Sequence, residues 1–192
     1  MFLEQFPIQN RSNGWIEVIC GSMFSGKTEE LIRRLKRAEI AKMKTAIFRP
    51  AIDNRYEKEH IVSHNQSKLK SYTVEKAADI IPLTKNADVI GIDEAQFFDE
   101  EIVNICKILA SNSARVVVAG LDKDYKGKPF GIMPNLMCEA DYVTKLRAIC
   151  VACGDPANFT QRLSKDTEQV IIGETDIYEA RCRGCYQPPG KS

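Results

Sequence analysis

The chain has 192 residues and a formal net charge of +1, with 44% hydrophobic and 28% charged residues. This length suits one domain, or one domain with a small appendage, and the near-neutral charge excludes a field that would draw the whole protein to nucleic acid or to a membrane. No apolar run approaches the ~20 residues that cross a bilayer, and residues 1–14 lack the pattern of a signal peptide, so we expect a cytoplasmic protein with reduced thiols.

Strand and helix patterns alternate along the chain. The apolar, β-branched run Trp15–Cys20 predicts a buried strand, and the spacing of apolar residues that follows predicts an amphipathic helix from Lys27 to about Met43. Further strands are predicted at Thr45–Phe48, Val89–Ile92 and Arg115–Ala119, and further helices at Val74–Pro82 and about Glu100–Ser111.

This order predicts an α/β fold across residues 15–147, with a parallel β-sheet covered by helices on both faces. The polar stretch 51–70, which holds His64, is long for a compact domain and predicts a functional or mobile loop. Residues 125–134 resemble a loop, and residues 1–14 and 187–192 are predicted to be flexible termini.

The segment Gly21–Thr28 matches the phosphate-binding pattern G-x-x-x-x-G-K-[ST]. Its glycines allow a tight turn that points backbone N–H groups at phosphates, and the following helix adds its dipole. Lys27 would neutralise the β- and γ-phosphates, and the hydroxyl of Thr28 would coordinate Mg²⁺. We therefore predict an ATP–magnesium site made by Gly21, Ser22, Met23, Phe24, Ser25, Gly26, Lys27 and Thr28.

Two carboxylates, Asp93 and Glu94, follow the predicted strand Val89–Ile92 directly. Since ligands collect at the carboxyl ends of parallel strands, both should lie close to Thr28. Asp93 suits Mg²⁺, and Glu94 suits a general base that takes a proton from an attacking hydroxyl or water. The alternative is a solvated pair at the end of a strand.

Two cysteine pairs, Cys150-x-x-Cys153 and Cys182-x-x-Cys185, enclose part of the C-terminal region. Doubled pairs of this kind form tetrahedral structural zinc sites, whereas a redox role would need one pair only. We expect the zinc to anchor a small lobe at residues 148–186 that lacks its own core. The remaining cysteines are interpreted as small buried apolar residues: Cys20, Cys106 and Cys138.

Taken together, these features resemble the type II, or cytosolic-type, thymidine kinases, from about Trp15 to Tyr186. The stretches that carry the resemblance are Gly21–Thr28, Asp53–Tyr56, Asp93–Phe98, Lys128–Gly131 and Tyr178–Tyr186. The Met-Phe-Ser sequence inside the phosphate loop and the Glu-Ala-Gln-Phe-Phe sequence after the strand make the combination specific. The chain departs from the family pattern where Tyr125 replaces a frequent Phe and Ser22 a frequent Pro.

The resemblance implies transfer of the γ-phosphoryl group of ATP to the 5′-hydroxyl of thymidine, which yields dTMP and ADP. It implies that Glu94 is the catalytic base, that Arg55 lies near the transferred phosphate, and that Asp93 and Gln96 join the loop in binding ATP. A lasso loop between the cysteine pairs would hold the base through main-chain groups. The implied nucleoside-binding residues are Met23, Leu121, Tyr125, Phe130, Thr160, Val170, Ile171, Ile172, Gly173 and Tyr178.

The resemblance further implies a homotetramer inhibited by its end product dTTP, without a nucleic-acid or membrane partner. It does not distinguish thymidine from deoxyuridine as the substrate. Phe97 and Phe98 are expected in the core, and the basic run Arg33, Arg34, Lys36 and Arg37 is expected on a solvated helix face.

Two other functions fit parts of the pattern. A P-loop zinc-ribbon ATPase that acts on nucleic acid would share the loop and the cysteine pairs, but it would want a basic surface with interleaved aromatic residues and a longer chain. A non-catalytic zinc-ribbon adaptor that only senses nucleotide would not need Glu94 beside Asp93.

Overall fold

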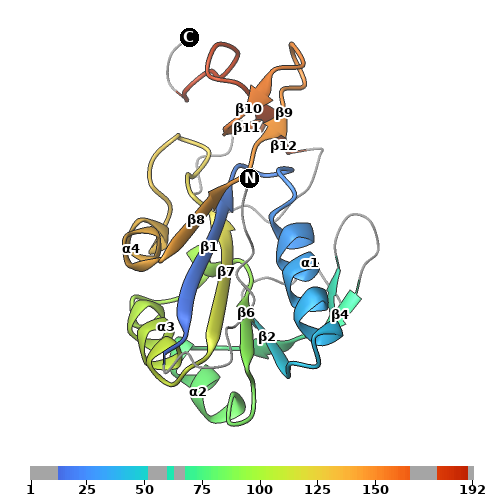
Figure 1. Cartoon of the computed structure of the whole chain (residues 1–192). Coiled ribbons are helices and arrows are strands. Elements are labelled where there is room, and N and C mark those ends of the chain that lie inside the picture. Colours follow the sequence, from blue (N-terminus) through green and yellow to red (C-terminus); the bar gives the residue numbers. More distant parts are fainter. Residues whose placement is uncertain (1–12, 52–59, 63–67, 165–176, 190–192) are drawn as a thin grey trace.

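The computed structural model describes residues 13–51, 60–62, 68–164 and 177–189. A central sheet of six strands has the order β5-β2-β6-β7-β1-β8, and every neighbouring pair in it is parallel (Figure 1). Its strands are β1 (Trp15–Gly21), β2 (Thr45–Pro50), β5 (Tyr72–Val74), β6 (Val89–Ile92), β7 (Arg115–Leu121) and β8 (Tyr142–Lys145). The α/β prediction is confirmed.

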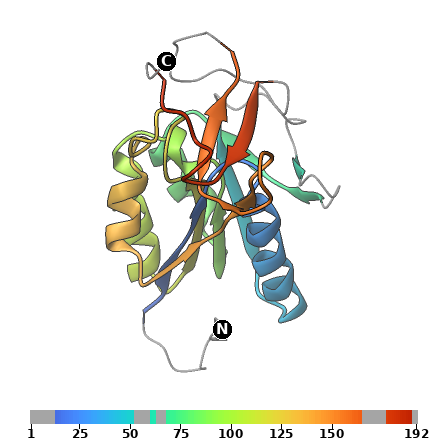
Figure 2. The same ribbon diagram turned by 90° about the horizontal axis from the view of Figure 1, so that it is seen from above.

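Helices cover both faces of this sheet (Figure 2). Helix α1 (Lys27–Ile40) lies on one face, and α3 (Glu101–Ser111) and α4 (Met133–Glu139) lie on the other. The short elements are η1 (Ala77–Asp79), α2 (Ile80–Leu83) and η2 (Ala95–Phe97).

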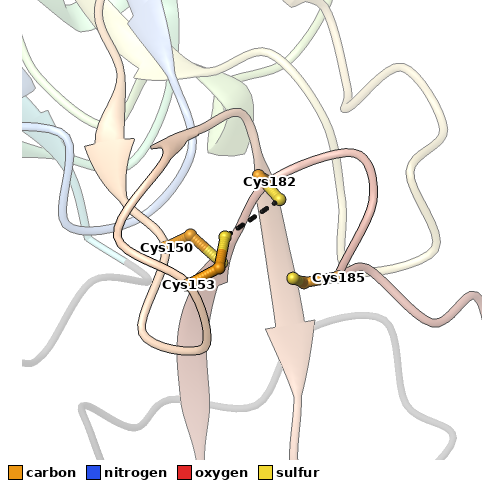
Figure 3. Close-up of side chains that lie close together, drawn as sticks. All are labelled: Cys150, Cys153, Cys182 and Cys185. Atoms are coloured by element: carbon orange, nitrogen blue, oxygen red, sulfur yellow. Dashed lines mark hydrogen bonds between the residues drawn. The ribbon is translucent and has the colours of Figure 1, made fainter.

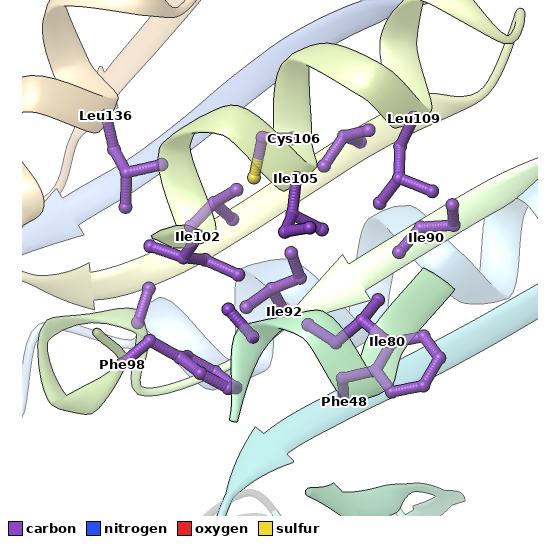
Figure 4. Packing of buried hydrophobic residues seen from close by; sticks show 14 of the residues in the cluster. Phe48, Ile80, Ile90, Ile92, Phe98, Ile102, Ile105, Cys106, Leu109 and Leu136 are labelled. Atoms are coloured by element: carbon purple, nitrogen blue, oxygen red, sulfur yellow. The ribbon is translucent and has the colours of Figure 1, made fainter. Parts of the chain in front are cut away.

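Each face of the sheet has its own apolar core. Alternate residues of β1 point to opposite faces, so Val18 and Cys20 join the larger core beneath α3, whereas Ile19 joins the core beneath α1. Figure 4 shows the larger core, where Ile90 and Ile92 of β6 lie among side chains of α3 and α2. Burial on both faces fixes the register of the strands, because a shift would move apolar side chains out of the cores. The carboxyl ends of the strands therefore keep constant relative positions.

A buried charged cluster lies beside β1 on the α1 face. Glu17 is 6% exposed, and its carboxylate accepts hydrogen bonds from Arg34 at 2.7 Å, Arg115 at 2.7 Å and the indole of Trp15 at 2.6 Å. Arg34 is 3% exposed and also donates to Glu30 at 2.8 Å. Burial alone would raise the pKa of Glu17, but the bonds and charges of Arg115, Trp15 and Arg34 hold that pKa below its ordinary value.

The solvated-face prediction is therefore wrong for Arg34, although Arg33 and Arg37 are exposed. A run of basic residues gives no indication that one of its members faces a buried carboxylate on a neighbouring strand.

Several other predictions need correction. Val74 ends strand β5, so the helix predicted at Val74–Pro82 is replaced by η1 and α2. Strand β8 and helix α4 were not predicted, because β8 is a short edge strand of alternating exposure and α4 has only 7 residues. Phe98 is buried, but Phe97 is only half-buried.

The lone cysteines also differ from one another. Cys20 and Cys106 are buried as expected, and burial raises the pKa of the Cys106 thiol to about 12. Cys138 is exposed on α4, so its assignment to the core was wrong.

Two small hairpins form a C-terminal lobe above the carboxyl ends of the sheet strands (Figure 1). They pair β9 (Ala148–Ile149) with β10 (Pro156–Ala157), and β11 (Phe159–Arg162) with β12 (Tyr178–Arg181). Their apolar cluster holds five buried residues, and Phe24 of the phosphate loop packs against it. A side chain of the phosphate loop therefore completes the apolar core of the lobe.

The polar stretch predicted at 51–70 contributes a further hairpin, β3 (His60–Val62) with β4 (Lys68–Lys70). In the part of the chain that the structure describes, no helix is both long and apolar enough to cross a membrane.

We expect Glu17→Gln to lower the free energy of unfolding by about 3 kcal/mol, because it removes the buried negative charge that Arg34 and Arg115 share. Urea titration of the purified protein measures this change. The matched control is Arg33→Gln, which breaks a pair with Glu30 whose arginine side chain is 50% exposed, and it should change stability by less than about 1 kcal/mol. Equal losses in the two variants would contradict a central role for Glu17.

The lowered pKa of Glu17 gives this contribution a pH dependence. The stabilisation is complete above the unfolded-state pKa of about 4.3 and is lost as pH falls through the lower folded-state value. The difference in stability between wild type and Glu17→Gln should therefore shrink below about pH 4.

Candidate active site

The phosphate loop joins β1 to α1 through two glycines with positive φ. Gly21 has φ 150, and a Cβ there would lie 2.5 Å from the carbonyl oxygen of Leu146. Gly26 caps α1 in the left-handed region, with φ 82 and ψ 24. Side chains at these positions would disturb the turn, so the pattern of glycines in the sequence has a direct structural cause.

Groups within the loop hold its shape. The ammonium of Lys27 and the hydroxyl of Ser25 both donate to the carbonyl oxygen of Ser22, each at 2.8 Å. The loop ends at the N-terminus of a 14-residue helix, where the first N–H groups and the helix dipole favour an anion. This arrangement suits a polyphosphate.

Two oxygen ligands for a hard cation meet beside the loop. The hydroxyl of Thr28 lies 3.2 Å from Oδ2 of Asp93, which is 5% exposed at the end of β6. A hydroxyl and a carboxylate are the donors that Mg²⁺ prefers, and Mg²⁺ in nucleotide sites takes its other ligands from phosphates and water. The donor set therefore fits magnesium.

Glu94 occupies a strained position next to this pair. Its φ of 50 and ψ of 42 lie in the left-handed region, which is uncommon outside glycine. The backbone N–H of Glu94 donates to Asp93 Oδ1 at 3.0 Å, and its Oε2 accepts a bond from Gln96 Nε2 at 2.5 Å. Strain that surrounding contacts maintain is frequent at functional sites.

The described residues of the implied nucleoside pocket come from three segments. Tyr125 and Phe130 follow β7 and are buried, and Phe130 packs edge-on against Phe97 with ring centroids 5.7 Å apart. Thr160 and Tyr178 lie on the paired strands β11 and β12. Leu121 ends β7 in register with Gly21.

The C-terminal lobe contacts the phosphate loop directly. The backbone N–H of Met23 donates to the hydroxyl of Thr160 at 3.0 Å, and the hydroxyl of Ser22 lies 3.5 Å from the carbonyl oxygen of Ala157. The lobe and the loop thus form a continuous wall. Arg55, His64 and the lasso residues Val170, Ile171, Ile172 and Gly173 lie outside the described residues.

Arg162 belongs to this wall, although the sequence did not indicate it. It is 7% exposed, its guanidinium carbon lies 3.5 Å from the ring centroid of Tyr125, and its Nη2 donates to the hydroxyl of Tyr178 at 2.6 Å. Arg162 therefore ties together two aromatic residues from distant segments. Thr160 and Arg162 lie two positions apart on β11 and therefore share one face of the strand.

A second pair that the sequence did not indicate lies at the same edge of the sheet. Asp122 follows β7, is 7% exposed, and pairs with Lys145 at the end of β8, with 2.5 Å between Nζ and Oδ2. The pair spans β1 and braces the strand that enters the phosphate loop.

The four paired cysteines converge in the lobe (Figure 3). Their sulfur atoms all lie within 4.8 Å of one another, and Sγ of Cys153 and Sγ of Cys182 are 3.6 Å apart. Four sulfurs at about 2.3 Å from a tetrahedral zinc ion would be about 3.8 Å apart. The cluster fits a closed zinc site.

Comparison with known proteins agrees with this geometry. Residues 14–186 match the family model described as thymidine kinase. A thymidine kinase of Rhodothermus sp. (strain ITI 518) is 56% identical over 178 residues, which cover 93% of this chain and 84% of the relative. Thymidine kinases of Bacteroides thetaiotaomicron and Bacteroides fragilis (strain YCH46) are 53% and 52% identical, and each alignment covers 97% of this chain and 94% of the relative. The chain therefore belongs to the thymidine kinase family, as its resemblance implied.

Proposed function

We propose that the protein transfers the γ-phosphoryl group of ATP to the 5′-hydroxyl of thymidine, which yields ADP and dTMP for DNA precursor salvage. The observation that carries this proposal is the position of Glu94, a carboxylate held beside the Thr28–Asp93 pair at the edge where the phosphate loop begins. The family supplies the nucleoside acceptor, since its members here are named thymidine kinases.

The phosphate loop would bind the triphosphate. Its backbone N–H groups and the start of α1 would face the phosphates, and Lys27 would exchange the carbonyl oxygen of Ser22 for phosphate oxygens. Thr28 and Asp93 would hold magnesium, which supplies charge neutralisation on the transferring group. Phosphoryl transfer depends mainly on such positioning and charge compensation.

Glu94 would orient the 5′-hydroxyl and accept its proton as the new bond to phosphorus forms and the bond to the β-phosphate oxygen breaks. Arg55 is proposed to stabilise the negative charge that spreads over the transferred group. Closure of the lasso over the site would exclude water, which otherwise competes as an acceptor.

The nucleoside would lie between the loop, the segment after β7 and the C-terminal lobe. Buried aromatic and apolar groups suit a flat base, and the buried hydroxyl of Thr160 is held by the N–H of Met23. Arg162 would keep Tyr125 and Tyr178 in place around it. The proposed contacts are Met23, Leu121, Tyr125, Phe130, Thr160 and Tyr178, with the main chain of residues 170–173.

Several further assignments complete the proposal. Residues 15–147 would form the kinase domain and residues 148–186 the zinc-binding lasso domain. The protein would act in the cytoplasm as a homotetramer, with dTTP as its end-product inhibitor.

Substitution of Glu94 by Gln tests the proposed base. The amide cannot accept the proton, so we expect thymidine phosphorylation to fall about 10²- to 10⁴-fold while MgATP still binds. Chromatographic detection of dTMP gives the rate, and calorimetry gives ATP affinity. The matched control is Glu101→Gln in the exposed first turn of α3, which should keep wild-type activity. Near-normal activity in Glu94→Gln would reject the role.

A panel of nucleosides tests the acceptor. ADP should appear only when thymidine or a close pyrimidine deoxynucleoside is present, and single-stranded DNA should not stimulate it. ADP formation driven by DNA alone would favour the nucleic-acid ATPase instead.

Zinc content tests the cysteine cluster. We expect one zinc ion per chain by elemental analysis of the wild type, and its loss in Cys182→Ser together with a lower melting temperature, because the lobe has few apolar contacts of its own. Cys138→Ser, which changes an exposed cysteine of α4, should keep the zinc and the stability. Zinc loss in both variants, or in neither, would contradict the assignment.

A further inference from the structure

Gln96 lies in η2, two residues beyond the proposed base, and is only 4% exposed. The left-handed conformation of Glu94 turns the chain so that the two side chains meet. Their contact joins Gln96 Nε2 to Glu94 Oε2 at 2.5 Å. The amide of Gln96 is therefore buried against the Glu94 carboxylate, whereas a side chain that binds ATP would need to reach the open site.

The orientation of the amide is fixed by its second partner. Oε1 of Gln96 accepts the backbone N–H of Leu121 at 3.0 Å. A backbone N–H can only donate, so the oxygen must face Leu121 and the NH₂ group must face Glu94. Reversing the amide would place two donors together on one side and two acceptors together on the other.

Two glycines from different segments lie close to Gln96, one against its side chain and the other against its backbone. A Cβ on Gly120 of β7 would lie 2.9 Å from Gln96 Oε1 and 2.5 Å from the sulfur of Met133. Gly131, with φ 48, would bring a Cβ within 2.4 Å of the carbonyl oxygen of Gln96. Both the side chain and the backbone of Gln96 are therefore closely packed.

We propose that Gln96 is a positioning residue that holds the carboxylate of Glu94 toward the acceptor hydroxyl and ties it to the pocket wall at Leu121. This inference rests on the proposed kinase function. It differs from the ATP contact that the family resemblance implied for Gln96, because the polar atoms of its amide bond groups of the protein itself.

The proposed effect follows from the two bonds. The donated hydrogen bond fixes one carboxylate oxygen, and this limits rotation of the Glu94 side chain about its last torsion, which is otherwise broad. The accepted bond anchors the amide to the backbone at the end of β7, beside the residues implied to bind the nucleoside. The base and the pocket therefore keep a constant relative position, and small misplacements of catalytic groups reduce rates strongly.

A double-mutant cycle tests the proposal, with turnover of radiolabelled thymidine as the measurement. Gln96→Met keeps the length of the side chain but removes both bonds, so we expect kcat to fall about 10- to 100-fold with the KM for ATP within about 2-fold of wild type. In the Glu94→Gln background, the same substitution should change kcat by less than about 2-fold, because Gln96 acts through the carboxylate.

Gln96→Glu removes the hydrogen bond to Glu94 but keeps an acceptor for the N–H of Leu121. It is the second test of the proposal if Gln96→Met does not fold. The substitution places a second carboxylate against Glu94, so the two carboxylates repel each other or share a proton and kcat should fall. The matched control for loss of a strand N–H partner is Asp141→Leu, since the carboxylate of Asp141 accepts the N–H of Ile16 at 2.8 Å. This control should lower stability and leave kcat unchanged.

Four results would overturn the positioning role: a raised KM for ATP with unchanged kcat, an equal loss of kcat in both backgrounds, a loss of stability alone as in Asp141→Leu, and wild-type kcat in Gln96→Glu. If wild type phosphorylates thymidine and the Gln96 variants match it, only the positioning role fails. If wild type phosphorylates no nucleoside, the kinase function and the positioning role both fail.

Discussion

All six strands of the sheet run in one direction, so the carboxyl ends of β1, β6 and β7 lie on the same side of the sheet. The register pairs Gly21 with Leu121 and Ile92 with Val118, which brings the phosphate loop, Asp93 and the start of the pocket wall together. Parallel sheets need burial on both faces, and the two apolar cores provide it. Packing of the two apolar cores therefore fixes the strands, and the strands in turn fix the positions of the side chains in the site.

Backbone strain in the described residues shows which positions serve the site. Four residues other than glycine have positive φ: Phe24, Lys42, Glu94 and Ser113. Lys42 and Ser113 follow the ends of α1 and α3, where a left-handed residue commonly completes a helix. Phe24 and Glu94 have no such explanation, and a left-handed conformation costs roughly 1–2 kcal/mol there. Packing of Phe24 on the lobe and the bonds of Glu94 to Asp93 and Gln96 offset that cost.

Sequence patterns predicted the parts of the fold that depend on local chemistry. The loop Gly21–Thr28, the buried strand before Asp93 and the cysteine pairs each occupy a short stretch, and the structure contains the strands and the cysteine cluster that they indicated. Strand β8 was missed because it has only 4 residues, none of them buried, and so gives no apolar run.

The contacts that the sequence did not indicate have a different origin. Arg34, Gln96 and Arg162 take their roles from partners 17, 25 and 16 positions away, on other elements. Such pairs follow from the strand order and the crossover of helices, which no local pattern specifies. Arg34 therefore resembled a solvated residue, although the structure buries it against Glu17.

The C-terminal lobe and the phosphate loop depend on each other through three successive residues. Ser22 and Met23 contact Ala157 and Thr160 of the lobe, and Phe24 packs into the cluster beside the cysteines. The apolar core of the lobe is small, and two of its five residues, Cys150 and Cys182, belong to the cysteine cluster, so a metal bound there would stabilise the same core that Phe24 packs against. Loss of the cysteine cluster would then weaken the contacts that hold the phosphate loop against the lobe. It would affect phosphate binding although, among the described residues, no cysteine contacts the loop through a hydrogen bond to Ser22 or Met23.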